Sequence, residues 1–246
     1  MSSAPRIFVT QNSIFDGKVS IKGSDQKHLV KVLRLGLGDR VIICDMHRTE
    51  YDGRISEVAP DSVEITLGAG KRSAGEFPFR VSLFQGIPKG DKLETITQKA
   101  VELGIFSVIP VLCERSISRP DNRAAERKTQ RLNKISSAAA SQCGRGIIPT
   151  VMPPVSFLDA CSEMQKSDLF FVCYEDTGTL YIKDFLAEKK PESISFLIGP
   201  EGGLSAGEIT ICRELNIPLI GLGKRILRTE TASGFVLAAI SILNEH

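Results

Sequence analysis

Apolar and polar residues alternate in short runs through the first 70 residues of the chain. The segment Val63-Glu-Ile-Thr-Leu67 has the two-residue period of a half-buried strand. One helical stretch interrupts these runs, with Ser24 as its N-cap, residues 28–35 as its body and Gly36 as its end. Short strands around a single helix predict a small N-terminal β-barrel. The strands are expected at residues 6–9, 18–21, 39–44, 51–58 and 62–67.

The pattern changes after residues 68–75, which are rich in Gly and Ser and lack periodicity, so we expect a linker there. The predicted domains are residues 1–72 and 76–246. In the second domain strand and helix patterns alternate, which predicts an α/β fold with a mostly parallel sheet. Its strands are expected at residues 79–87, 107–112, 169–174, 194–198 and 218–222, and its helices at residues 91–103, 123–140, 156–165, 180–187, 205–215 and 230–243.

Composition excludes several classes of protein. No apolar run approaches the length of a bilayer span, and the first residues lack the apolar core of a signal peptide, so we expect a cytoplasmic protein without membrane contact. The six cysteines are scattered without a C-x-x-C pair, and there are only three histidines. We therefore expect reduced thiols and no metal site.

Charge is concentrated in one segment. The chain carries a formal net charge of +2, but residues 113–146 hold eight basic and three acidic residues, a net +5 that leaves −3 for the rest. Such a segment indicates either an anionic partner or a solvated helix face with internal ion pairs, and by itself it favours the solvated face. The basic residues are Arg115, Arg119, Arg123, Arg127, Lys128, Arg131, Lys134 and Arg145.

A glycine-rich turn follows the apolar run at residues 196–198. The turn is Gly199-Pro-Glu-Gly-Gly203, and Ser205 with Glu208 then forms a capping box that opens a helix. This order places bare backbone at the carboxyl end of a strand, where α/β sheets bind ligands. The turn lacks the phosphate-binding motifs, and Glu201 would repel a pyrophosphate. An uncharged or cationic ligand fits it better.

A second turn, Gly221-Leu-Gly-Lys-Arg-Ile-Leu-Arg-Thr-Glu-Thr-Ala232, precedes the last helix. Its cations stand just before a helix N-terminus, where the helix dipole disfavours positive charge. An anionic substrate would account for them. Pairing of Arg225 or Arg228 with Glu230 or Glu201 would account for them equally well, and the sequence leaves both readings open.

These two turns resemble those of the SPOUT methyltransferases, and more narrowly the ribosomal RNA small subunit methyltransferase E family, which methylates N3 of a uridine. Residues 28–35 with Gly38-Asp39 resemble the PUA-like barrel of that family. Further matching segments are Lys89-Gly-Asp-Lys-Leu-Glu94, Gln98-Lys-Ala100, Glu102-Leu-Gly104, Glu114-Arg-Ser116, Gln142-Cys-Gly-Arg145 and Ile148-Pro149. Ser141 departs from the family pattern, which has a glutamate there, so a local substrate or dimer contact stays open.

The resemblance implies a C-terminal domain with a deep trefoil knot, a homodimer, and S-adenosylmethionine bound by the two turns. A sulfonium beside an uncharged adenine needs backbone donors and acceptors with apolar walls. Glu201 would tolerate the positive donor, although capping its own turn or pairing with an arginine are alternative roles. The expected cofactor-binding residues are Leu197, Ile198, Gly199, Pro200, Glu201, Gly202, Leu222, Gly223 and Leu227.

The implied substrate is a uridine of 16S ribosomal RNA, or of the small ribosomal subunit, whose N3 must lose a proton before it attacks the methyl group. Arg228 or Arg225 is expected to stabilise the resulting negative charge or to hold a flanking phosphate, and Glu230 is a candidate base or a first-turn helix residue. The expected RNA contacts are Arg6, His28, Arg34, Lys89, Lys92 and Arg145. Two alternatives are a related enzyme acting on a ribose 2′-hydroxyl or another base, and an RNA-binding factor without catalysis.

Overall fold

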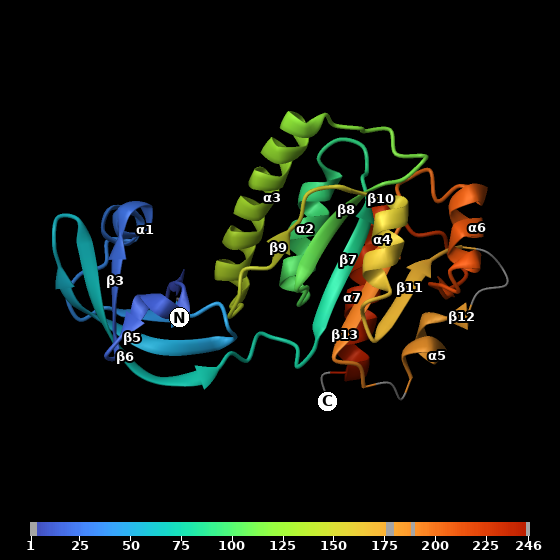
Figure 1. The fold of residues 1–246 in the computed structure, drawn as a ribbon. Coiled ribbons are helices and arrows are strands. Elements are labelled where there is room, and N and C mark those ends of the chain that lie inside the picture. Colours follow the sequence, from blue (N-terminus) through green and yellow to red (C-terminus); the bar gives the residue numbers. More distant parts are fainter. Residues whose placement is uncertain (1–3, 176–179, 188–189, 245–246) are drawn as a thin grey trace. The chain divides into compact units, whose positions relative to one another are not determined.

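The computed structural model describes residues 4–175, 180–187 and 190–244, and the chain forms two compact units (Figure 1). The first unit comprises Met1–Glu76 with Ala140–Ile148, and the second comprises Phe77–Ala139 with Pro149–His246. The predicted domains, residues 1–72 and 76–246, stay a prediction. Ala140–Ile148 belongs to the first unit, whereas the prediction assigned these residues to the second domain.

Among the described residues of the first unit, six strands form one sheet in the order β1-β4-β5-β6-β3-β2. β1 pairs in parallel with β4, and the other neighbours are antiparallel. Alternate residues face one core, in which Val41, Ile43, Val63 and Ile65 have no exposed surface. The strands are β1 (Arg6–Phe8), β2 (Ile14–Phe15), β3 (Lys18–Lys22), β4 (Arg40–Cys44), β5 (Thr49–Val58) and β6 (Ser62–Arg72), with a short 3-10 helix, η1 (Gln11–Ser13), before β2.

The expected linker at residues 68–75 is wrong over its first part, because β6 continues to Arg72. Gly70 pairs with Tyr51 near the end of the β5–β6 ladder, and Arg72 pairs with Thr49. A Cβ at Gly70 would lie 2.7 Å from the Tyr51 ring carbon Cε1. The glycine therefore makes room for an aromatic side chain beside a strand, and its presence does not indicate a break in the sheet.

The helix of the first unit also differs from the prediction. It begins as α1 (Gly23–Lys27), with Lys22 as its N-cap, and continues as a π-helical turn, η2 (His28–Val32). Gly23 has a φ of 67°, which lets the chain leave β3 one residue before the predicted cap, Ser24. The helical segment ends before Gly36, and Arg34 takes the left-handed conformation with a φ of 55°.

The second unit confirms the predicted α/β fold, since every strand pair described in it is parallel. The strand order is β10-β8-β7-β13-β11-β14-β12, with β9 on β8. Its strands are β7 (Arg80–Gly86), β8 (Ser107–Leu112), β9 (Thr150–Val151), β10 (Val155–Ser156), β11 (Leu169–Cys173), β12 (Leu180–Tyr181), β13 (Ser193–Ile198) and β14 (Leu219–Gly221). Its helices are α2 (Lys92–Glu102), α3 (Asn122–Cys143), α4 (Phe157–Met164), α5 (Ile182–Leu186), α6 (Ala206–Glu214) and α7 (Thr229–Asn244).

Helices cover both faces of this parallel sheet (Figure 1). α4 and α6 pack against one face, where Phe84, Val172 and Leu197 belong to the same apolar cluster as residues of both helices. α2 and α7 pack against each other and α7 also contacts β13 and α5. A sheet buried on both faces explains why its strands are nearly continuous apolar runs in the sequence.

The register of the sheet brings the carboxyl ends of its central strands together. Ile198 of β13 pairs with Gln85 of β7, and Cys173 of β11 pairs with Ile220 of β14. The segments that follow these four strands therefore leave the sheet at one edge, where the two glycine-rich turns meet.

No helix within the described residues is long and apolar enough to cross a membrane. None of the six cysteines forms a disulfide. The deep trefoil knot implied by the resemblance stays a prediction.

Candidate functional site

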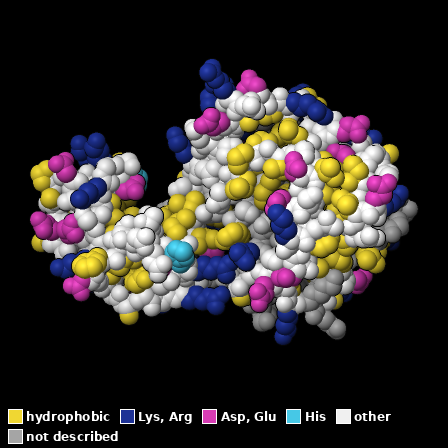
Figure 2. All heavy atoms as spheres, in the orientation of Figure 1, with side chains coloured by type: hydrophobic (Ala, Val, Ile, Leu, Met, Phe, Trp, Pro, Cys, Tyr) yellow, Lys and Arg dark blue, Asp and Glu magenta, His cyan; other side chains and the backbone are white. Residues whose placement is uncertain are grey.

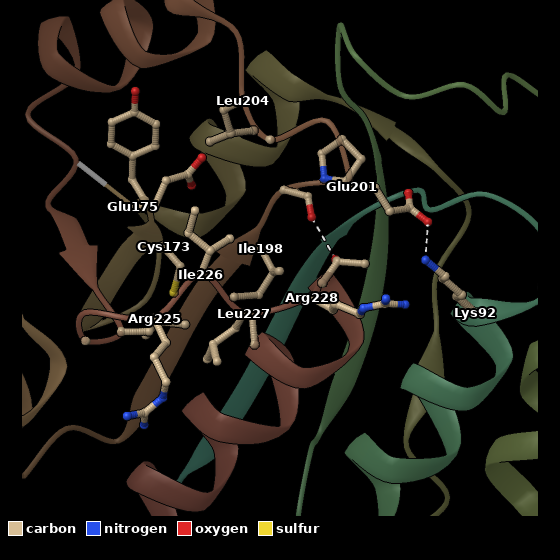
Figure 3. A pocket seen from close by; sticks show the side chains of 18 residues that line it. Lys92, Cys173, Glu175, Ile198, Glu201, Leu204, Arg225, Ile226, Leu227 and Arg228 are labelled. Atoms are coloured by element: carbon tan, nitrogen blue, oxygen red, sulfur yellow. Dashed lines mark hydrogen bonds and ion pairs between the residues drawn. The ribbon is translucent and has the colours of Figure 1, made fainter.

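A pocket of about 400 Å³ opens at the carboxyl edge of the parallel sheet (Figure 3). Three loops of the second unit form most of it: the segment after β11, the turn after β13, and the segment between β14 and α7. The lining residues are Lys92, Cys173, Tyr174, Glu175, Ile198, Gly199, Pro200, Glu201, Gly203, Leu204, Leu222, Gly223, Arg225, Ile226, Leu227, Arg228, Thr229 and Ala232.

The turn after β13 is held in place by contacts with the end of β7 and the start of α7. A Cβ at Gly86 would lie 2.6 Å from both the nitrogen and Cδ of Pro200, so only glycine at the end of β7 lets the turn approach. The Thr229 hydroxyl donates to the Gly199 carbonyl oxygen at 2.8 Å, shown as a dashed line in Figure 3. Gly203 ends the turn with a φ of 66°, a conformation that favours glycine.

Glu201 is engaged by groups at the start of α2. The Lys92 ammonium lies 2.8 Å from its Oε1, and the Lys89 backbone N–H lies 3.2 Å from each carboxylate oxygen. Partial burial raises the pKa of Glu201, but hydrogen bonds from Lys92 and from backbone N–H groups outweigh this effect and hold the pKa below its ordinary value. The anion therefore ties the turn to α2, and its ion-pair partner is a lysine where the sequence suggested an arginine.

The outer part of the turn is fixed by the segment after β8. The Arg115 guanidinium donates to the Gly202 carbonyl oxygen at 3.0 Å. The carboxylate of Glu208 accepts from the Ser205 N–H and the Glu114 N–H, both at 2.8 Å, so the predicted capping box also joins two loops. These contacts leave the turn little freedom before a ligand binds.

The loop before α7 presents two exposed arginines. Neither Arg225 nor Arg228 makes a side-chain hydrogen bond or ion pair with any residue that the structure describes. In Figure 3 Arg228 points toward the side of the pocket where Lys92 and Glu201 lie, whereas Arg225 points away from them. The pairing of either arginine with Glu230 or Glu201 is therefore absent from the described contacts.

Glu230 lies in the first turn of α7, where the helix dipole favours a carboxylate. Its Oε2 lies 3.8 Å from the Lys92 ammonium and has no hydrogen-bond partner among the residues described. Lys92 thus stands between two carboxylates, those of Glu201 and Glu230. Lys92 and Arg228 line the pocket, and Glu230 lies next to Lys92 outside the lining residues.

Seven of the expected cofactor residues line the pocket, and two do not. Leu197 is fully buried in the cluster beneath α4 and α6, because its side chain points to the opposite side of β13 from that of Ile198. Gly202 lies against Arg115, and its Cβ would come within 3.2 Å of the Arg115 Cβ. The lining segment Cys173–Glu175 was not expected from the sequence, although its place at the end of an apolar strand was the available signal.

Arg6 and Arg145, both expected to contact RNA, are held in internal ion pairs of the first unit. The Arg145 side chain is 3% exposed and bonds both carboxylate oxygens of Glu76 at 2.8 Å, so we correct its expected role to a structural one. Arg6 donates to Glu50 at 2.7 Å and to the Arg145 carbonyl oxygen at 3.3 Å. These bonds explain why Ala140–Ile148 belongs to the first unit.

The other expected RNA contacts are placed differently. His28 and Arg34 are exposed on the first unit. Lys92 lines the pocket of the second unit, and the backbone of Lys89 binds Glu201.

The basic segment divides into partnered and unpartnered residues. Lys128 and Arg131 both bind Glu94, at 2.7 and 2.8 Å, and Arg119 donates to backbone carbonyl oxygens. With Arg115 and Arg145 already described, the basic residues that lack a side-chain partner within the described ranges are Arg123, Arg127 and Lys134 of α3. Figure 2 shows Lys and Arg side chains projecting over the N-terminal end of α3, with acidic side chains among them.

No group of three or more His, Cys, Asp or Glu side chains that could hold a metal ion occurs in the part of the chain that the structure describes.

The chain is similar to known proteins over nearly its whole length. Residues 75–241 match the family model of an RNA methyltransferase domain, and residues 21–68 match that of an RNA methyltransferase PUA domain. The ribosomal RNA small subunit methyltransferase E of Bacillus subtilis (strain 168) is 37% identical over 231 residues, covering 92% of this chain and 90% of that protein.

Two solved structures carry a bound ligand. A ribosomal RNA small subunit methyltransferase E from Neisseria gonorrhoeae, bound to S-adenosylmethionine, is 27% identical with a TM-score of 0.85, and the alignment covers 98% of each chain. A putative methyltransferase from Legionella pneumophila with the same bound cofactor is 26% identical with a TM-score of 0.84, again over 98% of each chain.

Proposed function

We propose that this chain, which belongs to the ribosomal RNA small subunit methyltransferase E family, transfers a methyl group from S-adenosylmethionine to N3 of a uridine in 16S ribosomal RNA. Family membership establishes an S-adenosylmethionine-dependent methyltransferase of small-subunit ribosomal RNA. The uridine and its N3 atom are the proposal. The observation that supports them is Arg228, which stands without a side-chain partner among the described residues at the polar end of a donor-sized pocket.

The residues of the pocket fit the methyl donor. The backbone of Gly199 and Leu222 lines the pocket and carries N–H groups that can donate to an adenine, and Ile198 and Leu227 offer apolar walls. The turn presents no phosphate-binding motif, and Glu175, which lines the pocket, offers a carboxylate to a cationic ligand. S-adenosylmethionine supplies an electrophilic methyl group on a sulfonium when it is bound there.

Arg228 is the residue that we assign to the developing negative charge. N3 of uridine becomes nucleophilic only when its proton leaves, and the charge then spreads over the ring nitrogen and the neighbouring carbonyl oxygens. A guanidinium donates several fixed N–H bonds to such an anion. Arg228 has no competing acidic partner among the described residues, because Glu201 is already bound by Lys92 and Lys89.

Glu230 is the carboxylate that we assign to proton removal. Both oxygens of Glu201 are occupied, whereas the Glu230 carboxylate makes no described hydrogen bond through its buried Oε2, and its side chain is partly exposed. Lys92, which lies 3.8 Å from Glu230, orients that carboxylate next to the pocket. The proton then passes from Glu230 to solvent, because the Glu230 side chain is 22% exposed.

RNA contacts are proposed on both units. His28 and Arg34 supply exposed polar groups on the PUA domain, while Lys92 and Arg228 stand at the pocket. A base must be unstacked to reach a recessed site, so we propose a flexible nucleotide as the target. We also propose that the enzyme acts in the cytoplasm as a homodimer.

Mass-spectrometric mapping of modified nucleosides in ribosomal RNA tests the proposal. RNA from cells that lack this protein is expected to lose one methyl group from a uridine base of 16S RNA, and complementation is expected to restore it. Loss of a ribose 2′-O-methyl group with all base methylation retained would overturn the N3 assignment. Unchanged methylation, with no affinity of the protein for S-adenosylmethionine, would support a binding protein without catalysis.

A further inference from the structure

A buried chain of hydrogen bonds joins the Gly199–Gly203 turn to the loop that carries Arg228. Because this turn is proposed to bind the methyl donor, it is called the donor turn below. Gln85, at the carboxyl end of β7, has no exposed surface, and its Nε2 donates to the Thr229 hydroxyl at 2.8 Å. The Thr229 hydroxyl in turn donates to the Gly199 carbonyl oxygen at 2.8 Å. Thr229 immediately follows Arg228 and is the first residue of α7.

The direction of these bonds follows from the groups themselves. Gln85 Nε2 faces the Gly86 carbonyl oxygen at 3.0 Å and the Thr229 hydroxyl, with the Ile198 carbonyl oxygen farther away at 3.5 Å. The reverse orientation of the amide would bring its oxygen against carbonyl oxygens. Because a threonine hydroxyl has one hydrogen and Gln85 already donates to it, that hydrogen is directed to Gly199.

The arrangement leaves a polar atom of the core unsatisfied. Gln85 Oε1 is buried and has no hydrogen-bond partner among the described residues. An apolar residue of similar size would avoid this, since an unpaired buried acceptor destabilises a fold. The glutamine is therefore poorly explained by packing alone, and its two donor hydrogens are the feature that an apolar residue lacks.

We propose that Gln85 and Thr229 are positioning residues that hold the loop carrying Arg228 at a fixed place relative to the donor turn. Arg228 directly precedes α7, and its carbonyl oxygen accepts from the N–H groups of Thr231 and Ala232 in the first turn of the helix. With Thr229 anchored to Gly199, the α-carbon of Arg228 lies one residue from a fixed point on the donor turn. Loss of the anchor misplaces both the turn and the guanidinium.

The inference rests on the donor site and on the role of Arg228 in the proposed function. It predicts that Thr229→Val, which keeps the branched shape and removes the hydroxyl, weakens S-adenosylmethionine binding by about tenfold in calorimetry. The same variant is expected to lower kcat at saturating donor while the KM for RNA stays unchanged. Thr229→Ser restores the hydroxyl and is expected to restore both values. Gln85→Leu is expected to act in the same direction as Thr229→Val.

Thr97→Val is the matched control. Thr97 is also fully buried, and its hydroxyl donates to the Leu93 carbonyl oxygen at 2.8 Å within α2. This control is expected to lower the free energy of unfolding in urea without changing donor affinity or kcat. If Thr229→Val binds the donor as tightly as Thr97→Val, the positioning role is wrong, and failure of Thr229→Ser to restore affinity overturns it too.

A second outcome separates this inference from the proposed function. Wild type and Thr97→Val must bind S-adenosylmethionine and methylate RNA if the function is correct. If both do so and the Thr229 and Gln85 variants match them, only the positioning role fails. If wild-type protein binds no donor, the proposed function fails first. Should Thr229→Val not fold, Gln85→Leu decides the question by the same measurements.

Discussion

Single residues of this chain owe their roles to the partners that surround them. Glu201 looked like a ligand for a cation, yet in the structure it joins the donor turn to α2 through Lys92 and Lys89. By occupying that carboxylate, the lysines leave Arg228 without an acidic partner among the described residues. The availability of Arg228 for substrate is thus a consequence of a contact in which it takes no part.

Replacement of Arg228 by alanine is expected to lower kcat by roughly 100-fold, the scale seen when one charge-stabilising donor is removed from an active site. Donor affinity measured by calorimetry is expected to stay within about twofold of wild type, because the donor fits the Gly199 turn. Arg225→Ala is the comparison from the same loop, since this side chain points away from Lys92 and Glu201. Equal loss of activity in the two variants would contradict a specific role for Arg228.

At the scale of one element, α3 shows why a count of charged residues could not decide between a solvated helix face and a surface for an anionic partner. α3 carries cations that serve two purposes: Lys128 and Arg131 hold Glu94 of α2, while Arg123, Arg127 and Lys134 have no described partner. Arg123 and Arg127 are one helical turn apart, and like charges at this spacing destabilise a helix by a few tenths of a kcal/mol. An RNA backbone on this face would offset the repulsion.

The pair Arg123→Gln and Arg127→Gln is therefore expected to weaken RNA binding. The slope of log affinity against log salt concentration is expected to become shallower by about one for each phosphate that the protein no longer neutralises. The pair Lys128→Gln and Arg131→Gln removes the same charge from the same helix, but from side chains already bound to Glu94. An equal change in slope for both pairs would indicate net charge alone and no specific face.

α7 presents a further face to solvent. Phe235 is 41% exposed and Ile242 68% exposed, and their seven-residue spacing places them on one side of the helix. We assign this face to a second copy of the chain, as the proposed homodimer requires. Ile242→Glu is expected to shift the mass in light scattering from dimer to monomer, while Thr210→Glu adds the same charge on α6 and leaves the dimer intact. A dimer that persists in Ile242→Glu would place the interface elsewhere.

At the scale of the whole molecule, the pKa values of carboxylates in both units are lowered by nearby cations and hydrogen-bond donors. Burial raises the pKa of Glu50, but the hydrogen bond from Arg6 and the charges of Arg6 and Lys71 hold it below its ordinary value of 4.5. Hydrogen bonds also hold the pKa of Asp168 below its ordinary value of 3.8. These groups bind protons more readily in the unfolded chain, so acid favours unfolding.

The free energy of unfolding is expected to be level above about pH 5 and to fall as the pH drops through the lowered pKa values of these carboxylates. Urea titrations from about pH 3 to 7 would measure this, followed by circular dichroism because the chain has no tryptophan. Glu50→Gln is expected to lower stability at neutral pH and to reduce its acid dependence. A stability that rises on acidification would contradict the assigned directions.

Local patterns in the sequence predicted the longer strands, the helices and the two glycine-rich turns, but not the two-residue strands β2, β9, β10 and β12. The period of two in β6 and the apolar runs of β7 and β13 depend on which faces of the strands are buried. Burial therefore determines which neighbouring residues are apolar, and this pattern can be read from the sequence. For the same reason the α/β alternation and the pocket residues Ile198 to Glu201 were predictable. The knot and the homodimer rest on resemblance, because no local pattern encodes either.

The tertiary structure alone decided which charged groups are paired. Arg145 meets Glu76, Glu94 meets Lys128 and Arg131, and Glu201 meets Lys92, all across long stretches of chain. Such pairs leave no periodic signal, since either partner reads locally as an ordinary surface charge. The same holds for Gln85 and Thr229, whose contact is made only when β7 and α7 pack together. Secondary structure depends on residues that are neighbours in the sequence. That Arg228 has no side-chain partner among the described residues depends on the assembled fold.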